Sequence, residues 1–147
     1  MISTAQEFLE LMRSEDPSDY HRSRYDEAPI EVWWELIARY SLANEWVARN
    51  KTSPVEILRE LSRDPRVVVR TEVAMTRRIS LDIQACLAAD ADSSVRNALA
   101  NNAKVADEIL AQLAEDSEEF VRDSALRRIA NRRAEQVSAS NGDKPSI

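Results

Sequence analysis

Apolar and charged side chains recur along the chain at a constant interval of 26 residues. A valine followed by an arginine occurs three times at this interval, at Val69-Arg70, Val95-Arg96 and Val121-Arg122. An aspartate, a leucine, an isoleucine and an alanine keep the same interval, at Asp64, Asp90 and Asp116; Leu61, Leu87 and Leu113; Ile57, Ile83 and Ile109; and Ala48, Ala74 and Ala100. A further copy precedes them, one residue shorter, because PIEVWWEL from Pro29 matches PVEILREL from Pro54 position by position. The pattern indicates an internal repeat.

Each copy has the pattern of two short helices. Ser53 and Pro54 predict the start of the first helix, since serine caps helices and proline suits the first helical position. Ile57, Leu58 and Leu61 then form one apolar stripe with helical spacing. Asp64-Pro65 predicts the second helix in the same way, and Val69 and Val73 give its buried face.

One such helix pair cannot cover its own apolar face, whereas stacked copies can. We therefore expect an all-α fold: a short right-handed α-solenoid of about four two-helix repeats over residues 29–131, within a single domain of residues 1–137. The arginine after each valine is expected to reach an aspartate of its own or a neighbouring repeat. This structural ladder consists of Asp64, Arg70, Asp90, Arg96, Asp116 and Arg122.

The two ends of the chain do not repeat, and residues 1–28 are expected to cap the stack. Thr4 and Glu7 form a capping box, and Phe8, Leu9 and Met12 give the apolar side of a first helix. A polar segment follows as far as Pro29. At the other end, we expect a helix from near residue 118 to about 129, a further helix at 131–137, and a flexible tail at 138–147.

The stretch WVARNKTSPVEILRELSRDPRVVVR and its copies resemble the HEAT-like and leucine-rich-repeat-variant families, which are bacterial α-solenoids. The resemblance covers about residues 29–131. It implies a helical-repeat fold and binding of other macromolecules. Some leucine-rich-repeat-variant proteins carry a cysteine-ligated iron–sulfur cluster, and some HEAT-like proteins are DNA glycosylases. The single cysteine, Cys86, excludes such a cluster here.

Charge narrows the choice of partner. The chain has 147 residues and a net charge of −6, so it repels phosphate backbones overall, and nucleic acid is an unlikely partner. A basic protein is the better expectation. No apolar stretch is long enough for a membrane helix, and the first residues do not resemble a signal peptide. Together with the lone cysteine, these features favour the cytoplasm.

The residues needed for catalysis are scarce. The only histidine, His21, excludes a two-histidine zinc motif, and Cys86 alone excludes the usual thiolate metal sites. The only glycine, Gly142, excludes a phosphate-binding loop. We therefore expect no catalytic residues, no metal, no cofactor and no enzymatic activity.

Two tryptophans are candidates for partner binding. Trp33 aligns with Leu58 and Leu110 of other copies and is expected in the core. Trp34 and Trp46 fall in columns that are not consistently apolar. They either pack beneath the N-terminal cap or face a partner, since tryptophan is enriched at the centres of interfaces.

The ends of the predicted second helices give a further set of candidates. Their side chains vary between copies, as expected where a repeat scaffold presents a recognition surface. This row consists of Arg49, Asn50, Met75, Arg77, Asn101, Asn102, Arg127 and Arg128. The alternative is that these residues cap helix ends and solvate loops.

These features favour a non-catalytic protein-binding function. One specific form is an immunity or antitoxin-type protein that neutralises a basic bacterial toxin such as a nuclease, because an acidic surface speeds encounter with a basic one. One alternative is a scaffold or assembly subunit of a larger bacterial complex. Another is a nucleic-acid binder or glycosylase of the HEAT-like kind, which rests on analogy of fold.

Overall fold

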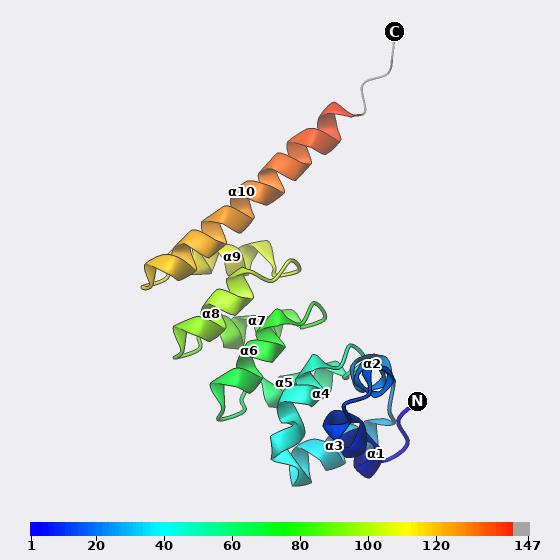
Figure 1. The fold of residues 1–147 in the computed structure, drawn as a ribbon. Helices are drawn as coiled ribbons and strands as arrows, with labels where there is room; N and C mark the ends of the chain where they lie inside the picture. The colour runs from blue at the N-terminus through cyan, green and yellow to red at the C-terminus, as the bar shows by residue number, and fades with distance from the viewer. Residues whose placement is uncertain (143–147) are drawn as a thin grey trace.

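The computed structural model describes residues 1–142 and shows an all-helical chain (Figure 1). Within these residues there are ten α-helices, one short 3-10 helix and no strand. The elements are α1 Ala5–Arg13, α2 Pro17–Tyr25, α3 Ile30–Arg39, η1 Ser41–Ala43, α4 Asn44–Arg49, α5 Val55–Leu61, α6 Val67–Met75, α7 Leu81–Ala88, α8 Ser93–Ala100, α9 Asp107–Leu113 and α10 Glu119–Asn141. The predicted all-α class is confirmed.

The helices pack mainly in chain order. From α4 onward, alternate helices contact one another: α4 contacts α6, α6 contacts α8, and α8 contacts α10. These four helices form one continuous line and are here called the second helices. The helices α5, α7 and α9 lie beside this line, and α7 also contacts α9. Figure 1 shows these helices stepping from α4 to α10, with loops on both sides of the stack.

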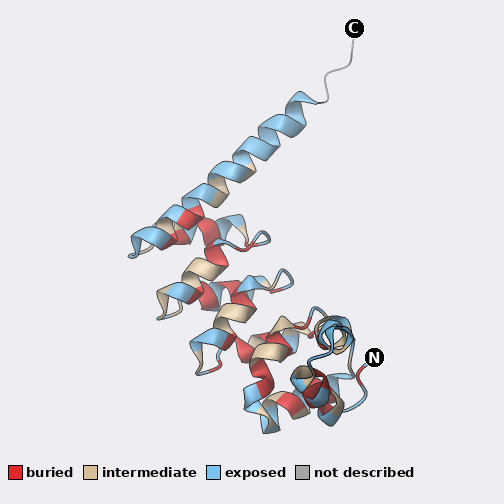
Figure 2. Cartoon of the chain, viewed as in Figure 1, coloured by how far each residue is buried: buried red, intermediate tan, exposed pale blue. Residues whose placement is uncertain are grey.

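The repeated apolar columns form the core. Val69, Val95 and Val121 are fully buried in α6, α8 and α10. Figure 2 shows that buried residues run through the interior of the stack, while the second half of α10 is mostly exposed. Trp33 is buried as expected and packs edge-on against Phe8 of α1, with the ring centroids 5.5 Å apart. The N-terminal helices thus share the core of the repeats.

In the copy that starts at Pro54, both helices begin later than the sequence predicts. The hydroxyl of Ser53 donates to the carbonyl of Val47 at 2.5 Å instead of capping α5, which begins at Val55. The carboxylate of Asp64 accepts from the backbone N–H of Arg66 at 2.9 Å, and α6 begins at the following residue. Both side chains use their hydrogen-bonding capacity in the loops.

The N-terminal segment contains two helices where one was predicted. The hydroxyl of Thr4 caps α1 by accepting from Glu7 N–H at 3.1 Å, while the Glu7 carboxylate accepts from Ser3 N–H at 2.8 Å, one residue before the usual partner. The polar segment folds as α2, which begins with Asp16 as its cap and Pro17 as its first residue. Only Ser23 of α2 is buried, so the apolar pattern gave no signal for this helix.

The C-terminal segment forms one helix, α10, where two were predicted. It has 23 residues, Glu119–Asn141, and contains neither proline nor glycine that would end it earlier. Residues 138–141, which were expected in a flexible tail, are its last turn, and residues 143–147 lie outside the described part of the chain. In the described part, no helix combines the length and the apolar character needed to cross a membrane.

Candidate protein-binding groove

Arginine–aspartate pairs link neighbouring second helices at their first turns. The guanidinium of Arg70 donates to both carboxylate oxygens of Asp90, at 2.7 and 3.1 Å. Arg96 binds Asp116 in the same way, at 2.8 and 3.1 Å. The remaining terminal nitrogen of Arg96 donates to the backbone carbonyl of Asp90 at 2.7 Å. These contacts are the ones expected of a ladder between repeats, and they place its residues in the framework.

The contacts of the ladder differ at its two ends. At the first position, 26 residues before Arg70, stands Asn44, whose amide donates to the buried carboxylate of Asp64 at 2.8 Å. Burial raises the pKa of Asp64, but hydrogen bonds from Arg66 and Asn44 outweigh it and hold that pKa below its ordinary value. Arg122, at the last position, donates to the carbonyls of Asp116 and Ser117 at 2.6 and 2.9 Å. The repeat interval itself could have identified Asn44.

Asn50 and Asn102 of the predicted row are buried, and their side chains bond to the backbone, as the helix-capping alternative for this row expects. The side-chain amide of Asn102 donates to the carbonyls of Ala74 and Thr76, at 2.8 and 2.9 Å. That of Asn50 donates to the carbonyl of Ser23 at 2.8 Å and to that of Asp26 at 3.1 Å. An amide can satisfy the carbonyls left free at a helix end. Asn50 therefore links the end of α4 to the end of α2, and Asn102 links the end of α8 to the end of α6.

Trp46 and Arg49 lie in contact with the N-terminal helices. Trp46 is half-buried and meets Tyr20 of α2 edge-on, with ring centroids 6.1 Å apart. Arg49 lies over the Trp46 ring and pairs with Glu45 at 2.6 Å and Glu72 at 2.9 Å. This is packing beneath the cap, one of the two interpretations of Trp46. Trp34, in contrast, keeps 41% of its surface exposed on α3.

Five residues of the predicted row line one groove. The groove has a volume of about 780 Å³ and runs over α6, α8 and α10. It is lined by Thr71, Met75, Arg77, Ser94, Asn97, Ala98, Asn101, Asn102, Ala103 and Arg128. A second hollow of about 520 Å³ adjoins it through the shared Arg77 and is lined by Tyr25, Lys51, Thr76, Arg77 and Arg78. Together we call them the basic groove. Arg127 is exposed but does not line it.

The basic groove is lined by cations and by no carboxylate. Its cations are Lys51, Arg77, Arg78 and Arg128. Arg78 donates to the carbonyl of Ser53 at 2.8 Å, and Arg128 donates to the carbonyl of Asn101 at 2.7 Å. None of the four is among the ion pairs within residues 1–142. The groove is therefore a region of positive charge on a chain whose net charge is −6.

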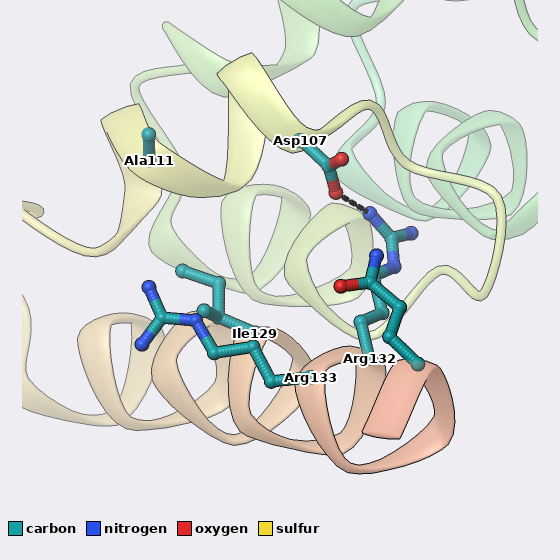
Figure 3. A pocket seen from close by; sticks show the side chains of 6 residues that line it. Asp107, Ala111, Ile129, Arg132 and Arg133 are labelled. Atoms are coloured by element: carbon teal, nitrogen blue, oxygen red, sulfur yellow. Dashed lines mark hydrogen bonds and ion pairs between the residues drawn. The ribbon is translucent and has the colours of Figure 1, made fainter. Parts of the chain in front are cut away.

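A smaller pocket, of about 280 Å³, lies between α9 and α10 (Figure 3). In Figure 3 the guanidinium of Arg132 reaches Asp107, which it contacts at 2.5 Å. Arg132 also donates to the carbonyl of Val105 at 2.6 Å. These bonds hold α10 against α9, so Arg132 and Asp107 of this pocket are engaged in the fold.

The side chains that could take part in catalysis or metal binding do not form a common site among the described residues. His21 stacks on Tyr25 with ring centroids 4.6 Å apart, and Cys86 is exposed on α7. Within residues 1–142, no three histidine, cysteine, aspartate or glutamate side chains gather as metal ligands would. Comparison of the chain with protein-family models, with curated proteins and with solved structures gave no match.

Proposed function

We propose that the chain is a short α-solenoid of the HEAT-like kind that binds another protein and catalyses no reaction. The observation that carries the proposal is the basic groove, where Met75, Arg77, Asn101 and Arg128 converge from three successive second helices and the loops after them. The groove is lined by side chains that differ from copy to copy, as in repeat proteins that recognise macromolecules. The ladder arginines and buried asparagines leave this surface fixed in shape.

An immunity or antitoxin-type role for a basic bacterial toxin, such as a nuclease, is the specific form we favour. The net charge of −6 supports it, because a negative field raises the rate at which a basic protein is encountered. Blocking a toxin requires only a stable contact, and the chain offers no residue set for chemistry. A role as a scaffold subunit would use the same groove.

Capture from a lysate of the source organism tests protein binding. The bait would be the tagged chain, compared with Met75→Glu, which adds a charged group at a residue that is 51% exposed in the groove. The matched control is Leu81→Glu, at a residue that is 47% exposed on α7 and does not line the groove. We expect one protein to be retained by the original chain and by the control, and to be lost from the Met75 variant. Failure of any protein to be retained above background would reject the proposal.

Nucleic-acid binding is a second candidate, and the four cations of the basic groove favour it. A gel-shift experiment at low salt tests it, since phosphate contacts strengthen as salt is lowered. Retention of DNA or RNA by the chain, lost on Arg77→Gln, would support this candidate. We expect no retention, because the surrounding acidic surface repels a long polyanion.

A further inference from the structure

We propose, building on the proposed protein-binding function, that the basic groove binds an acidic segment of the partner protein that also carries large apolar side chains. The partner as a whole can be basic, while the segment that enters the groove is acidic. The inference rests on three features of the groove: its unpaired cations, its free arginine donors and its exposed apolar groups.

The unpaired cations are informative because the chain has an excess of acids. It contains 26 aspartates and glutamates against 20 lysines and arginines, and eight arginines form ion pairs within the described residues. Arg77 and Lys51 nevertheless form no ion pair within residues 1–142, and no carboxylate lines the hollow that they share. Cations gathered without counter-charges repel one another, and an anionic ligand relieves that repulsion.

The arginine donors suit carboxylates. Arg77 is exposed, and no side-chain hydrogen bond engages its guanidinium within residues 1–142. Arg128 uses one terminal nitrogen on the carbonyl of Asn101, so its other nitrogens remain available. A guanidinium binds a carboxylate through two parallel hydrogen bonds, which gives both strength and direction. Asn97 and Asn101 add amide groups along the same wall.

The exposed apolar side chains of the groove indicate which residues the bound segment carries besides its acidic ones. Met75 is 51% exposed in the groove, and Tyr25 is 50% exposed in the adjoining hollow. Methionine adapts its shape to varied partners, and tyrosine offers a rigid apolar ring. A segment with acidic and large apolar side chains would satisfy both kinds of group. A nucleic-acid backbone would leave Met75 without an apolar contact.

A structural role for the same cations has a different consequence. Arg77 and Arg78 follow the end of α6, where positive charge stabilises the helix dipole. If that were their whole role, replacing them would lower the melting temperature and leave ligand binding unchanged. The melting temperature of every variant named below is therefore measured beside its affinity for ligand.

The experiment selects ligands from a phage-displayed library of random peptides about 12 residues long, which span about 40 Å when extended. Selected peptides would be synthesised with a fluorescent label and their affinity measured by anisotropy. We expect them to be rich in aspartate and glutamate and to contain phenylalanine, leucine or tryptophan. Arg77→Gln/Arg128→Gln should weaken their binding about tenfold or more, as expected for lost charge-assisted hydrogen bonds.

The matched control is Arg63→Gln/Arg133→Gln, which removes the same charge at two exposed arginines that do not line the basic groove and form no ion pair within the described residues. It should bind the peptides as the original chain does. If the double groove variant fails to fold, Arg77→Gln alone serves, because no hydrogen bond among the described residues depends on that guanidinium.

Three results would overturn the inference. Selected peptides that are neutral or basic would do so, as would acidic peptides that bind both double variants equally. Binding of a labelled DNA or RNA fragment that outcompetes the peptides would assign the cations to phosphate instead. None of these results would reject the proposed protein-binding function. That function is rejected only if the lysate experiment retains no protein.

Discussion

At the scale of single residues, the repeated aspartates each serve two helices. The carboxylate of Asp116 accepts from Arg96 of the preceding copy, while its backbone carbonyl accepts from Arg122 of its own copy at 2.6 Å. The same carboxylate accepts from Glu118 N–H at 2.9 Å and so orders the loop before α10. Asp90 makes the corresponding contacts with Arg70, Arg96 and its own loop. A shorter or uncharged side chain would lose one of these roles.

Replacing Arg96 with alanine should lower the free energy of unfolding by about 1–3 kcal/mol, because it leaves the carboxylate of Asp116 without its charged partner. Chemical denaturation would measure the change. Arg63→Ala is the control, since Arg63 is exposed and forms no ion pair within residues 1–142, and it should change stability by less than about 0.5 kcal/mol. Equal effects of the two replacements would contradict a role for the ladder.

Replacing Asn102 with alanine should cost about 2 kcal/mol, because two backbone carbonyls and the N–H of Lys104 lose their partner. Its exposed neighbour Asn101 provides the comparison: Asn101→Ala should change stability by less than about 0.5 kcal/mol. Thermal unfolding followed by circular dichroism would separate the two. A larger loss of stability for Asn101→Ala than for Asn102→Ala would contradict the role assigned to Asn102.

The difference between these two asparagines shows what could be predicted from the sequence. The Arg–Asp contacts were predictable, because partners that keep one interval must meet again at every copy. The burial of Asn50 and Asn102 was not, because an asparagine after a helix can face solvent or bond a carbonyl. Only the position of the preceding helix end decides between the two.

At the scale of elements, the apolar pattern located the helices that bury a full stripe and missed the one that does not. The helix α2 buries only Ser23, yet its start was marked by Asp16 and Pro17, the same Asp-Pro signal that was applied at Asp64. Helix α10 was divided in two because its apolar pattern weakens after Ile129. The backbone continues since no residue interrupts the helical hydrogen bonds.

The two halves of α10 should differ in local stability. Arg132 is the last residue of α10 whose side chain bonds to another helix or its loop, through Asp107 and the carbonyls of Ala103 and Val105. Residues 134–141 of α10 extend away from the stack (Figure 1). We expect amide hydrogen exchange to be slow at 121–129 and fast at 134–141, since an isolated helix of that length is marginal in water. Mass spectrometry of exchanged peptides would measure it, and equal protection along α10 would contradict it.

At the scale of the whole molecule, opposite charges are separated. The net charge is −6, yet the basic groove gathers Lys51, Arg77, Arg78 and Arg128 in the loops after the second helices and on α10. The repeated aspartates lie at the other end of the second helices, where arginines neutralise them. The total charge suggested a basic partner, whereas the groove itself is lined by cations, which is why we propose an acidic segment for it. That reversal depends on tertiary structure and could not be predicted from composition.

Stability should fall in acid, and Asp116 should contribute to the fall. The hydrogen bond from Arg96 holds the pKa of Asp116 below its ordinary value. The unfolded chain therefore binds this proton more readily, so the contribution of Asp116 is complete above a pH of about 4 and is lost as the pH drops through the lower folded pKa. The free energy of unfolding, measured in urea at several pH values below about 5, should fall less steeply for Asp116→Asn than for the original chain. An identical slope would contradict the assignment.

The two sets of ties have a mechanical consequence. Arg70 and Arg96 join the second helices near their first turns. Just beyond the last turns, Asn102 joins α8 to α6, and Asn50 joins α4 to α2. Bending the stack toward one edge would stretch the hydrogen bonds at the opposite edge. We therefore expect the stack to be stiff. The spacing between Met75 and Asn101 is then set before a partner arrives. If the groove binds a partner as proposed, docking should cost little conformational entropy, and a partner whose side chains repeat at another spacing should bind more weakly.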